Sequence, residues 1–215
     1  QTKAALERNG VKYTGLPGQI ARVCVDGVRV AVLGFSPYSW NQSLLDIPAA
    51  RALARKAAKT ADVVVVLMHA GAEGADETHT PQGAEYAYGE NRGDPRAFAH
   101  AVVGAGADLV LGSGPHVIRG MERYRGRLIA YSLGDFAGWN TFRLGGELSL
   151  SGLLTVRIDE DGRLRGGRWL SLRLESPGVP TVDPSHEAAR LVRRLSAQDF
   201  VKTVPMDAKG RITAP

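Results

Sequence analysis

Strand-like patterns dominate the first half of the chain. Residues 22–25 and 28–34 alternate apolar and polar positions around Asp26-Gly27, which is typical of a β-hairpin with a two-residue turn. Residues 62–69 and 108–112 are instead continuous apolar runs, as in strands buried on both faces of a sheet. Such runs, separated by helical segments, predict a mainly parallel central sheet.

Apolar residues recur at helical spacing in several other segments. These segments are residues 2–8, 47–60, 96–105 and 185–196. The third follows Asp94-Pro95, which is a favourable start for a helix. Between these elements, residues 70–93 form a glycine-rich acidic stretch without periodicity, and a loop of this length inside a compact domain is usually functional or disordered.

The last third of the chain has a different pattern. Residues 148–158 and 164–174 flank a polar turn and give the clearest hairpin signature in the sequence. Shorter strands are expected at 120–124 and 128–132, and the tail after Pro205 is expected to be loose. The hairpins imply a second, antiparallel sheet, so the whole pattern predicts one mixed α/β fold.

Composition excludes several classes of protein. Apolar residues make up 44% of the chain and charged residues 23%, which argues against disorder. The net charge of +5 is small and is not segregated, so no nucleic-acid partner is expected. No apolar run is long enough to span a membrane. The single cysteine, Cys24, excludes an intrachain disulfide framework, and its alternating strand predicts a buried thiol.

Two histidines follow the buried strands directly. His69 ends the first run, and His116 comes after the second, inside a Gly-Pro turn. Because open α/β sheets place their sites beyond the carboxyl ends of the strands, the two imidazoles are expected to meet at one edge. Imidazole is the commonest metal-binding side chain, so His69 and His116 are candidate metal ligands and catalytic residues. The alternative is that each is an ordinary core or loop residue.

Three further residues are candidates for the same site. Glu73, four residues after His69, is a candidate proton donor, ligand or partner of a ligand. Asp135 lies on a tight turn after another predicted strand, is expected to face the same opening and is a candidate substrate-binding residue. Arg119 belongs to an arginine-rich stretch and is a candidate clamp for a phosphate or carboxylate, although such arginines also protect sheet edges from aggregation.

Three motifs resemble one known family. Residues 64–73 (VVVLMHAGAE), 106–117 (GADLVLGSGPHV) and 127–136 (RLIAYSLGDF) resemble, in order, conserved strand ends of the CapA-type poly-γ-glutamate capsule-synthesis proteins. That family belongs to the calcineurin-like metallophosphoesterase superfamily. The resemblance therefore implies an α/β/β/α sandwich of mixed sheets, and it covers residues 1 to 140.

The resemblance also implies a site. In such a site His69 and His116 would hold a divalent metal (Mn, Zn, Mg or Fe), Glu73 would lie beside it, and Asp135 would replace the family's Asn. Two departures from the family pattern reduce this expectation. The first is that Ser113 and Gly114 stand where the family has paired histidines. The N-terminal strands that carry further ligands in the family are also expected to be missing, and a binuclear centre needs several more ligands than two histidines.

These observations favour a particular function and leave one alternative open. The chain is expected to comprise an incomplete CapA-like domain over residues 1–175, with a C-terminal helix and tail over 176–215 packed on it. The expected function is metal-assisted hydrolysis in the intact protein, in the synthesis of a cell-surface polymer. Expected partners are an anionic polymer or a phosphorylated small molecule and capsule-synthesis membrane proteins, at an extracytoplasmic location in the cell envelope. The alternative is a non-catalytic polymer-binding or assembly module that has lost the metal.

Overall fold

The computed structural model describes residues 1–140 and 143–214. The helices are α1 (Thr2–Arg8), α2 (Ile47–Ala58), α3 (Pro95–Val103) and α4 (Glu187–Asp199), with a short 3-10 helix η1 (Gly146–Ser149). The strands are β1 (Ala21–Val25), β2 (Val28–Phe35), β3 (Val63–His69), β4 (Glu85–Ala87), β5 (Glu90–Gly93), β6 (Leu109–Ser113), β7 (Met121–Tyr124), β8 (Arg127–Ala130), β9 (Leu150–Ile158), β10 (Leu164–Glu175), β11 (Val179–Val182) and β12 (Arg211–Thr213).

A six-stranded mixed sheet forms the centre of the fold, in the order β1-β2-β3-β6-β8-β7. The strands β2, β3, β6 and β8 are parallel, and the predicted hairpin of β1 and β2 closes one edge of the sheet. The register pairs His69 at the end of β3 with Ser113 at the end of β6. The predicted mixed α/β architecture is confirmed.

A second, antiparallel sheet is built around the long strand β10, which pairs with β9, β11 and β12. The pairing of β9 with β10 confirms the predicted C-terminal hairpin. The tail after Pro205 is not loose, as had been expected, because residues 211–213 form β12 and the side chain of Ile212 is buried against the second sheet. Backbone pairing and apolar burial together fix this end of the chain.

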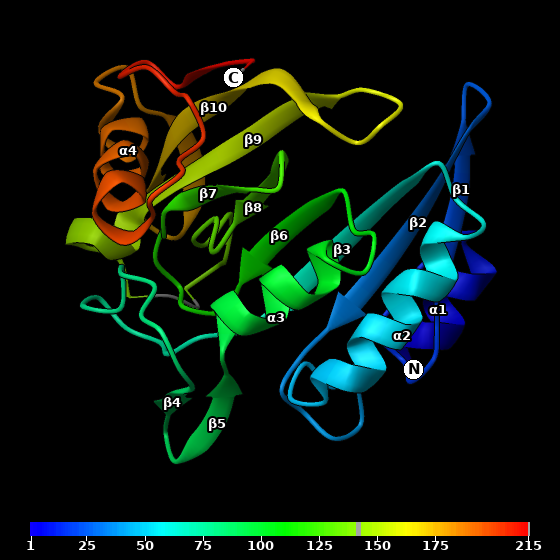
Figure 1. The fold of residues 1–215 in the computed structure, drawn as a ribbon. Helices are drawn as coiled ribbons and strands as arrows, with labels where there is room; N and C mark the ends of the chain where they lie inside the picture. The colour runs from blue at the N-terminus through cyan, green and yellow to red at the C-terminus, as the bar shows by residue number, and fades with distance from the viewer. Residues whose placement is uncertain (141–142, 215) are drawn as a thin grey trace.

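Two apolar cores flank the central sheet. One lies under α2 and α3, whose buried faces pack on Leu33, Val66 and Val110 of the sheet. The other lies between the opposite face of the sheet, the second sheet and α4, and it includes Trp169. Figure 1 shows α2 and α3 along the outer face of the central sheet, with β9 and β10 on its other side and α4 beside β7. Helices α2 and α3 each begin with an aspartate cap. At the start of α3, Asp94 accepts a hydrogen bond from the backbone N–H of Ala97.

Two local expectations are corrected. The stretch of residues 70–93 is not without structure, because β4 and β5 pair as a small antiparallel hairpin within it. Cys24 is exposed rather than buried, because β1 is the edge strand of the sheet and most of its residues face solvent. The alternation of β1 therefore indicates a strand but does not indicate that its apolar face is covered.

An exposed ion pair fixes the start of β3 and gives a pH-dependent contribution to stability. Arg29 donates from its side chain and its backbone N–H to Asp62, and these bonds lower the pKa of Asp62 to about 2. Because this pKa lies below the unfolded value, the stabilisation is complete above about pH 4 and is lost as the pH falls towards 2. The Asp62→Asn variant should therefore be less stable than the wild type at pH 7, with a difference that shrinks in acid. Urea unfolding at several pH values measures this difference in stability. Glu160→Gln, at an exposed turn position, is the control. A difference between Asp62→Asn and the wild type that is constant with pH would contradict the prediction.

Candidate active site

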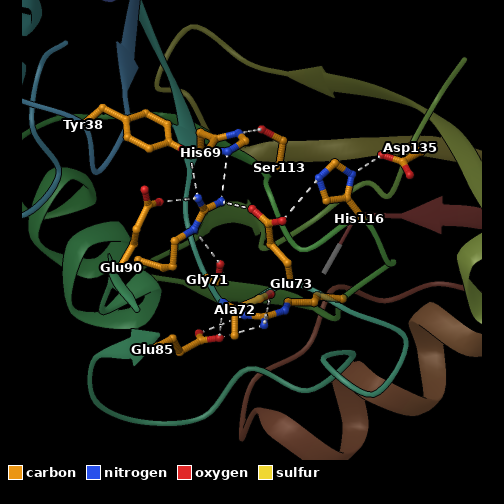
Figure 2. A network of polar contacts seen from close by, with 12 residues as sticks. Tyr38, His69, Gly71, Ala72, Glu73, Glu85, Glu90, Ser113, His116 and Asp135 are labelled. Atoms are coloured by element: carbon orange, nitrogen blue, oxygen red, sulfur yellow. Dashed lines mark hydrogen bonds and ion pairs between the residues drawn. The ribbon is translucent and has the colours of Figure 1, made fainter. Parts of the chain in front are cut away.

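The carboxyl ends of β3 and β6 bring the two predicted histidines to one edge of the central sheet. His69 is the last residue of β3, beside Ser113 at the end of β6. The chain then turns at Gly114-Pro115, and His116 adopts a left-handed backbone conformation with φ of +61°. Figure 2 shows both imidazoles at this edge, on either side of Glu73. Both rings therefore lie at the expected edge of the sheet, although the side chains of Arg92 and Glu73 lie between them.

An ion pair between Glu73 and Arg92 lies between the two imidazoles. Nη2 of Arg92 lies 2.6 Å from Oε1 of Glu73 and 3.0 Å from Nε2 of His69. The other carboxylate oxygen of Glu73 lies 3.7 Å from Nε2 of His116. A continuous row of polar contacts thus runs from His69 through Arg92 and Glu73 to His116 (Figure 2).

His69 is held as a neutral imidazole. A guanidinium donates and never accepts, so its approach to Nε2 requires that Nε2 accept and that Nδ1 carry the proton. Nδ1 then faces the hydroxyl oxygen of Ser113, 3.4 Å away. Burial lowers the pKa of His69, the charge of Arg92 lowers it further, and Glu73 opposes the shift. His69 is thus suited to accept a hydrogen bond or bind a cation, and not to donate from Nε2.

His116 is in the opposite electrostatic situation. Its Nδ1 lies 2.7 Å from Oδ1 of Asp135, whose carboxylate is largely buried. This hydrogen bond raises the pKa of His116, burial works against it, and the charges of Asp135 and Glu73 add to the increase. Environments that separate the pKa values of two neighbouring groups are typical of acid and base pairs in enzymes. Because Nδ1 points to Asp135, Nε2 is the ring nitrogen of His116 that faces Glu73.

Asp135 therefore has a different role from the one expected. It faces the same opening, as its turn predicted, but it holds the ring of His116 instead of offering its carboxylate to a substrate. A buried carboxylate that binds one ring nitrogen fixes the tautomer and orientation of a histidine. We conclude that Asp135 is a positioning residue for His116.

The expected anion clamp at Arg119 is not supported by its location. Its side chain is 0% exposed, and both Nη atoms lie within 3 Å of the carboxylate of Glu85. It also donates to the backbone oxygens of Ala72 and Glu77, and the carboxylate of Glu77 lies 4.0 Å from its Nη2. An anion in solvent cannot reach this guanidinium, which instead fastens the long loop to the body of the domain. Glu85 is its buried partner.

Arg92 and Tyr38 are residues of the site that sequence reasoning missed. Arg92 lies in β5, and its side chain is only 2% exposed; Nη1 donates to the hydroxyl of Tyr38. Tyr38 lies in the loop after β2, stacked on Trp40, and it forms one wall of a cavity of about 340 Å³ beside His69. The one signal for Arg92 was its place in the long glycine-rich loop after His69, where functional residues often lie.

These residues do not fit a metal centre by themselves. In the ranges that the structure describes, no group of three or more His, Cys, Asp or Glu side chains is arranged to hold a metal ion. In addition, Nε2 of His69 and Oε1 of Glu73 both accept from the guanidinium of Arg92. The role of His69 and His116 as metal ligands stays a prediction.

Comparison with known proteins identifies the family. The family model described as "Bacterial capsule synthesis protein PGA_cap" matches residues 1–138, which is more than half of the chain. The chain belongs to this family. The match includes His69, Glu73, Arg92, His116 and Asp135, so all the polar residues of the site lie within the PGA_cap region.

Curated PGA_cap relatives are similar over the same region. The PGA biosynthesis protein CapA of Bacillus subtilis (strain 168) is 33% identical over 132 residues, covering 55% of this chain and 31% of that protein. The capsule biosynthesis protein CapA of Bacillus anthracis is 35% identical over 135 residues, covering 54% of this chain and 29% of that protein. The chain thus spans about a third of the length of these relatives.

Two further findings complete the comparison. A solved structure from Staphylococcus aureus, assigned as a 5′-nucleotidase in complex with α-ketoglutarate, has a TM-score of 0.43 and 16% identity, covering 83% of this chain and 33% of that one. Within the described residues, none of the helices has the length and apolar character needed to cross a membrane.

Proposed function

We propose that this chain carries part of a hydrolytic site that acts on an anionic polymer of the poly-γ-glutamate type, or on a phosphorylated precursor, during capsule synthesis. The bond cleaved is an amide or a phosphoester. Membership of the PGA_cap family supports the context of capsule synthesis, and the names of the CapA relatives support the class of polymer. The proposal places the protein in the cell envelope, with membrane proteins of capsule synthesis as partners.

The observation that carries this proposal is the acid and base pair formed by His116 and Glu73. The hydrogen bond from Nδ1 to Asp135 raises the pKa of His116, which favours the doubly protonated ring whose Nε2–H can act as the acid. Glu73 Oε2 lies 3.7 Å from that nitrogen and is held by Arg92 on its other side. A positioned proton donor beside a positioned acceptor is the arrangement that general acid–base catalysis requires.

Each residue then has a defined part in the reaction. Glu73 takes a proton from the attacking water as its oxygen bonds to the carbonyl carbon or phosphorus. His116 gives its Nε2 proton to the nitrogen or oxygen that leaves, while Asp135 stabilises the ring. The reaction leaves Glu73 protonated and His116 neutral, and their separation of 3.7 Å allows the proton to return and restore both groups. Arg92 keeps Glu73 in place.

Hydrolysis assays on the intact protein test this assignment. Glu73→Gln and His116→Gln should each reduce turnover of γ-linked glutamate oligomers or of a phosphoester by about 100-fold or more, as expected for loss of a general acid or base. His79→Gln is the matched control, because His79 is half exposed and contacts Asp199, away from this site. Turnover that both site variants retain at the wild-type level would contradict the proposal.

A non-catalytic binding module is the second candidate function. It is favoured by Ser113 and Gly114, which stand where the family resemblance expects histidines, and by the incomplete set of metal ligands in the described residues. The same assays separate the two functions. Binding of poly-γ-glutamate by calorimetry without turnover by the wild-type protein would favour the binding module over the hydrolase.

A further inference from the structure

Arg92 is placed as a cation would be placed between two metal-ligating side chains. Its Nη2 lies 3.0 Å from Nε2 of His69 and 2.6 Å from Oε1 of Glu73, the two atoms through which these residues would bind a metal. The side chain is 2% exposed, so its charge is fixed inside the site instead of moving in solvent. Arginine cannot lose its proton in a protein, so this positive charge is permanent.

All three guanidinium nitrogens of Arg92 are occupied by groups of the site. Besides the contacts of Nη2, the Nε atom donates to the backbone oxygen of Gly71 at 3.3 Å, and Nη1 donates to the hydroxyl of Tyr38 at 2.8 Å. Nη1 also lies 3.7 Å from a carboxylate oxygen of Glu90. A guanidinium with its donors used in this way does not serve as an anion clamp. Its function is to hold the groups around it.

A second observation links Arg92 to the departure at position 114. Gly114 has φ of +120°, and a Cβ added there would lie 3.4 Å from Nη2 of Arg92 and 3.1 Å from the backbone of Ala70. A longer side chain at this position would compete with the guanidinium for space. The family resemblance expects a histidine at position 114. The glycine found there is therefore compatible with the position of the Arg92 guanidinium.

We propose that Arg92 is the resident cation of this site and takes the place of a bound metal ion between His69 and Glu73. It positions both side chains and keeps their lone pairs from a divalent cation. Removing the guanidinium frees Nε2 of His69 and the carboxylate of Glu73, so both become available to a divalent cation. The inference concerns the same site as the proposed hydrolase but does not require that hydrolysis occurs.

Metal titration of the intact protein tests this role. Calorimetry with Zn²⁺ and with Mn²⁺ should show that Arg92→Leu binds at least about tenfold more tightly than the wild type, a difference of about 1.4 kcal/mol. Adding His69→Ala to the leucine variant should remove the gain. Arg92→Lys is the matched control, because it keeps a positive charge at this position and should not gain affinity.

The outcomes separate this inference from the competing ones. If Arg92→Leu gains no affinity, or if the gain survives His69→Ala, the inference is overturned. Should the leucine variant fail to fold, NMR of the imidazoles in the wild type gives the answer. Resonances of His69 that stay unshifted when Zn²⁺ or Mn²⁺ is added support Arg92 as the resident cation, and shifted resonances overturn it and support the sequence-based metal prediction. Turnover is not measured, so failure here leaves the test of hydrolysis separate.

Discussion

Replacing Arg119 by alanine should lower the free energy of unfolding by about 3–5 kcal/mol, the range expected when one partner of a buried ion pair is removed. Arg119 and Glu85 are both buried, and the guanidinium donates to both carboxylate oxygens. Without Arg119, the charge of Glu85 remains inside the domain with only the backbone N–H of Ala72 as a partner among its described contacts. Urea or thermal unfolding of the variant measures the loss.

A double variant separates the loss of the pair from the loss of packing. Arg119→Met with Glu85→Leu removes both charges and keeps side chains of similar length, so it should recover much of the stability lost by Arg119→Ala. Arg127→Ala is the matched control, because that arginine also forms an ion pair, with Asp108, but its pair is partly exposed. If Arg119→Ala unfolds no more easily than this control, the loop is not fastened by the buried pair.

The Arg119→Ala variant also distinguishes a structural role of Arg119 from a role as an anion clamp. The Arg119–Glu85 pair fastens the loop that carries Glu73 and Arg92, so its loss should loosen the site without removing any group that touches a ligand. If Arg119 were an anion clamp, the alanine variant would lose affinity for an anionic polymer while keeping its stability. The burial of the side chain predicts the opposite result.

The strand-end histidines could be predicted because their position follows from local pattern alone. Apolar runs identify β3 and β6, and parallel strands joined by a helix place their carboxyl ends at one edge. His69 at the end of β3 and His116 shortly after β6 are therefore expected at the same edge. The location of Asp135 was predictable for the same reason, since its turn follows another strand of that sheet.

The roles of Arg92 and Glu85 could not be predicted in the same way. Arg92 and Glu85 both lie in the stretch of residues 70–93, where no periodicity fixes the direction of a side chain. Their contacts depend on the path of the loop, which is set by the β4–β5 hairpin and by the buried pair with Arg119. Charge patterning in the sequence identifies such residues only as acidic or basic and does not show which of them become buried.

The exposure of Cys24 illustrates a second limit. An alternating strand predicts that one face is apolar, but burial of that face needs a neighbouring layer. The edge position of β1 was not visible in the pattern, because the order of strands in a sheet depends on pairing between distant segments. The C-terminal tail shows the converse. Residues 211–213 carry a weak strand signal, yet β10 offers them a free edge to pair with.

Replacing Trp169 by alanine should destabilise the fold by about 3–5 kcal/mol, as is typical when a large aromatic side chain is removed from a core. Trp169 is 0% exposed and belongs to the core between the two sheets and α4. Its Nε1 is buried without a hydrogen-bond partner in the part of the chain that the structure describes. Trp169→Phe should therefore lose packing but no hydrogen bond, and denaturant unfolding should show a smaller loss for phenylalanine than for alanine.

Gly152 on the neighbouring strand makes the prediction sharper. A Cβ added at Gly152 would lie 2.2 Å from the indole ring of Trp169, so the ring occupies the space that a side chain there would need. Gly152→Ala should be strongly destabilising in the wild type and much less so when Trp169 is already alanine, since the cavity then accepts the methyl group. Residues in direct contact give coupling free energies of about 0.5–3 kcal/mol in such double-mutant cycles. Additive losses would mean that β9 and β10 do not pack as the register of Leu154 opposite Trp169 requires.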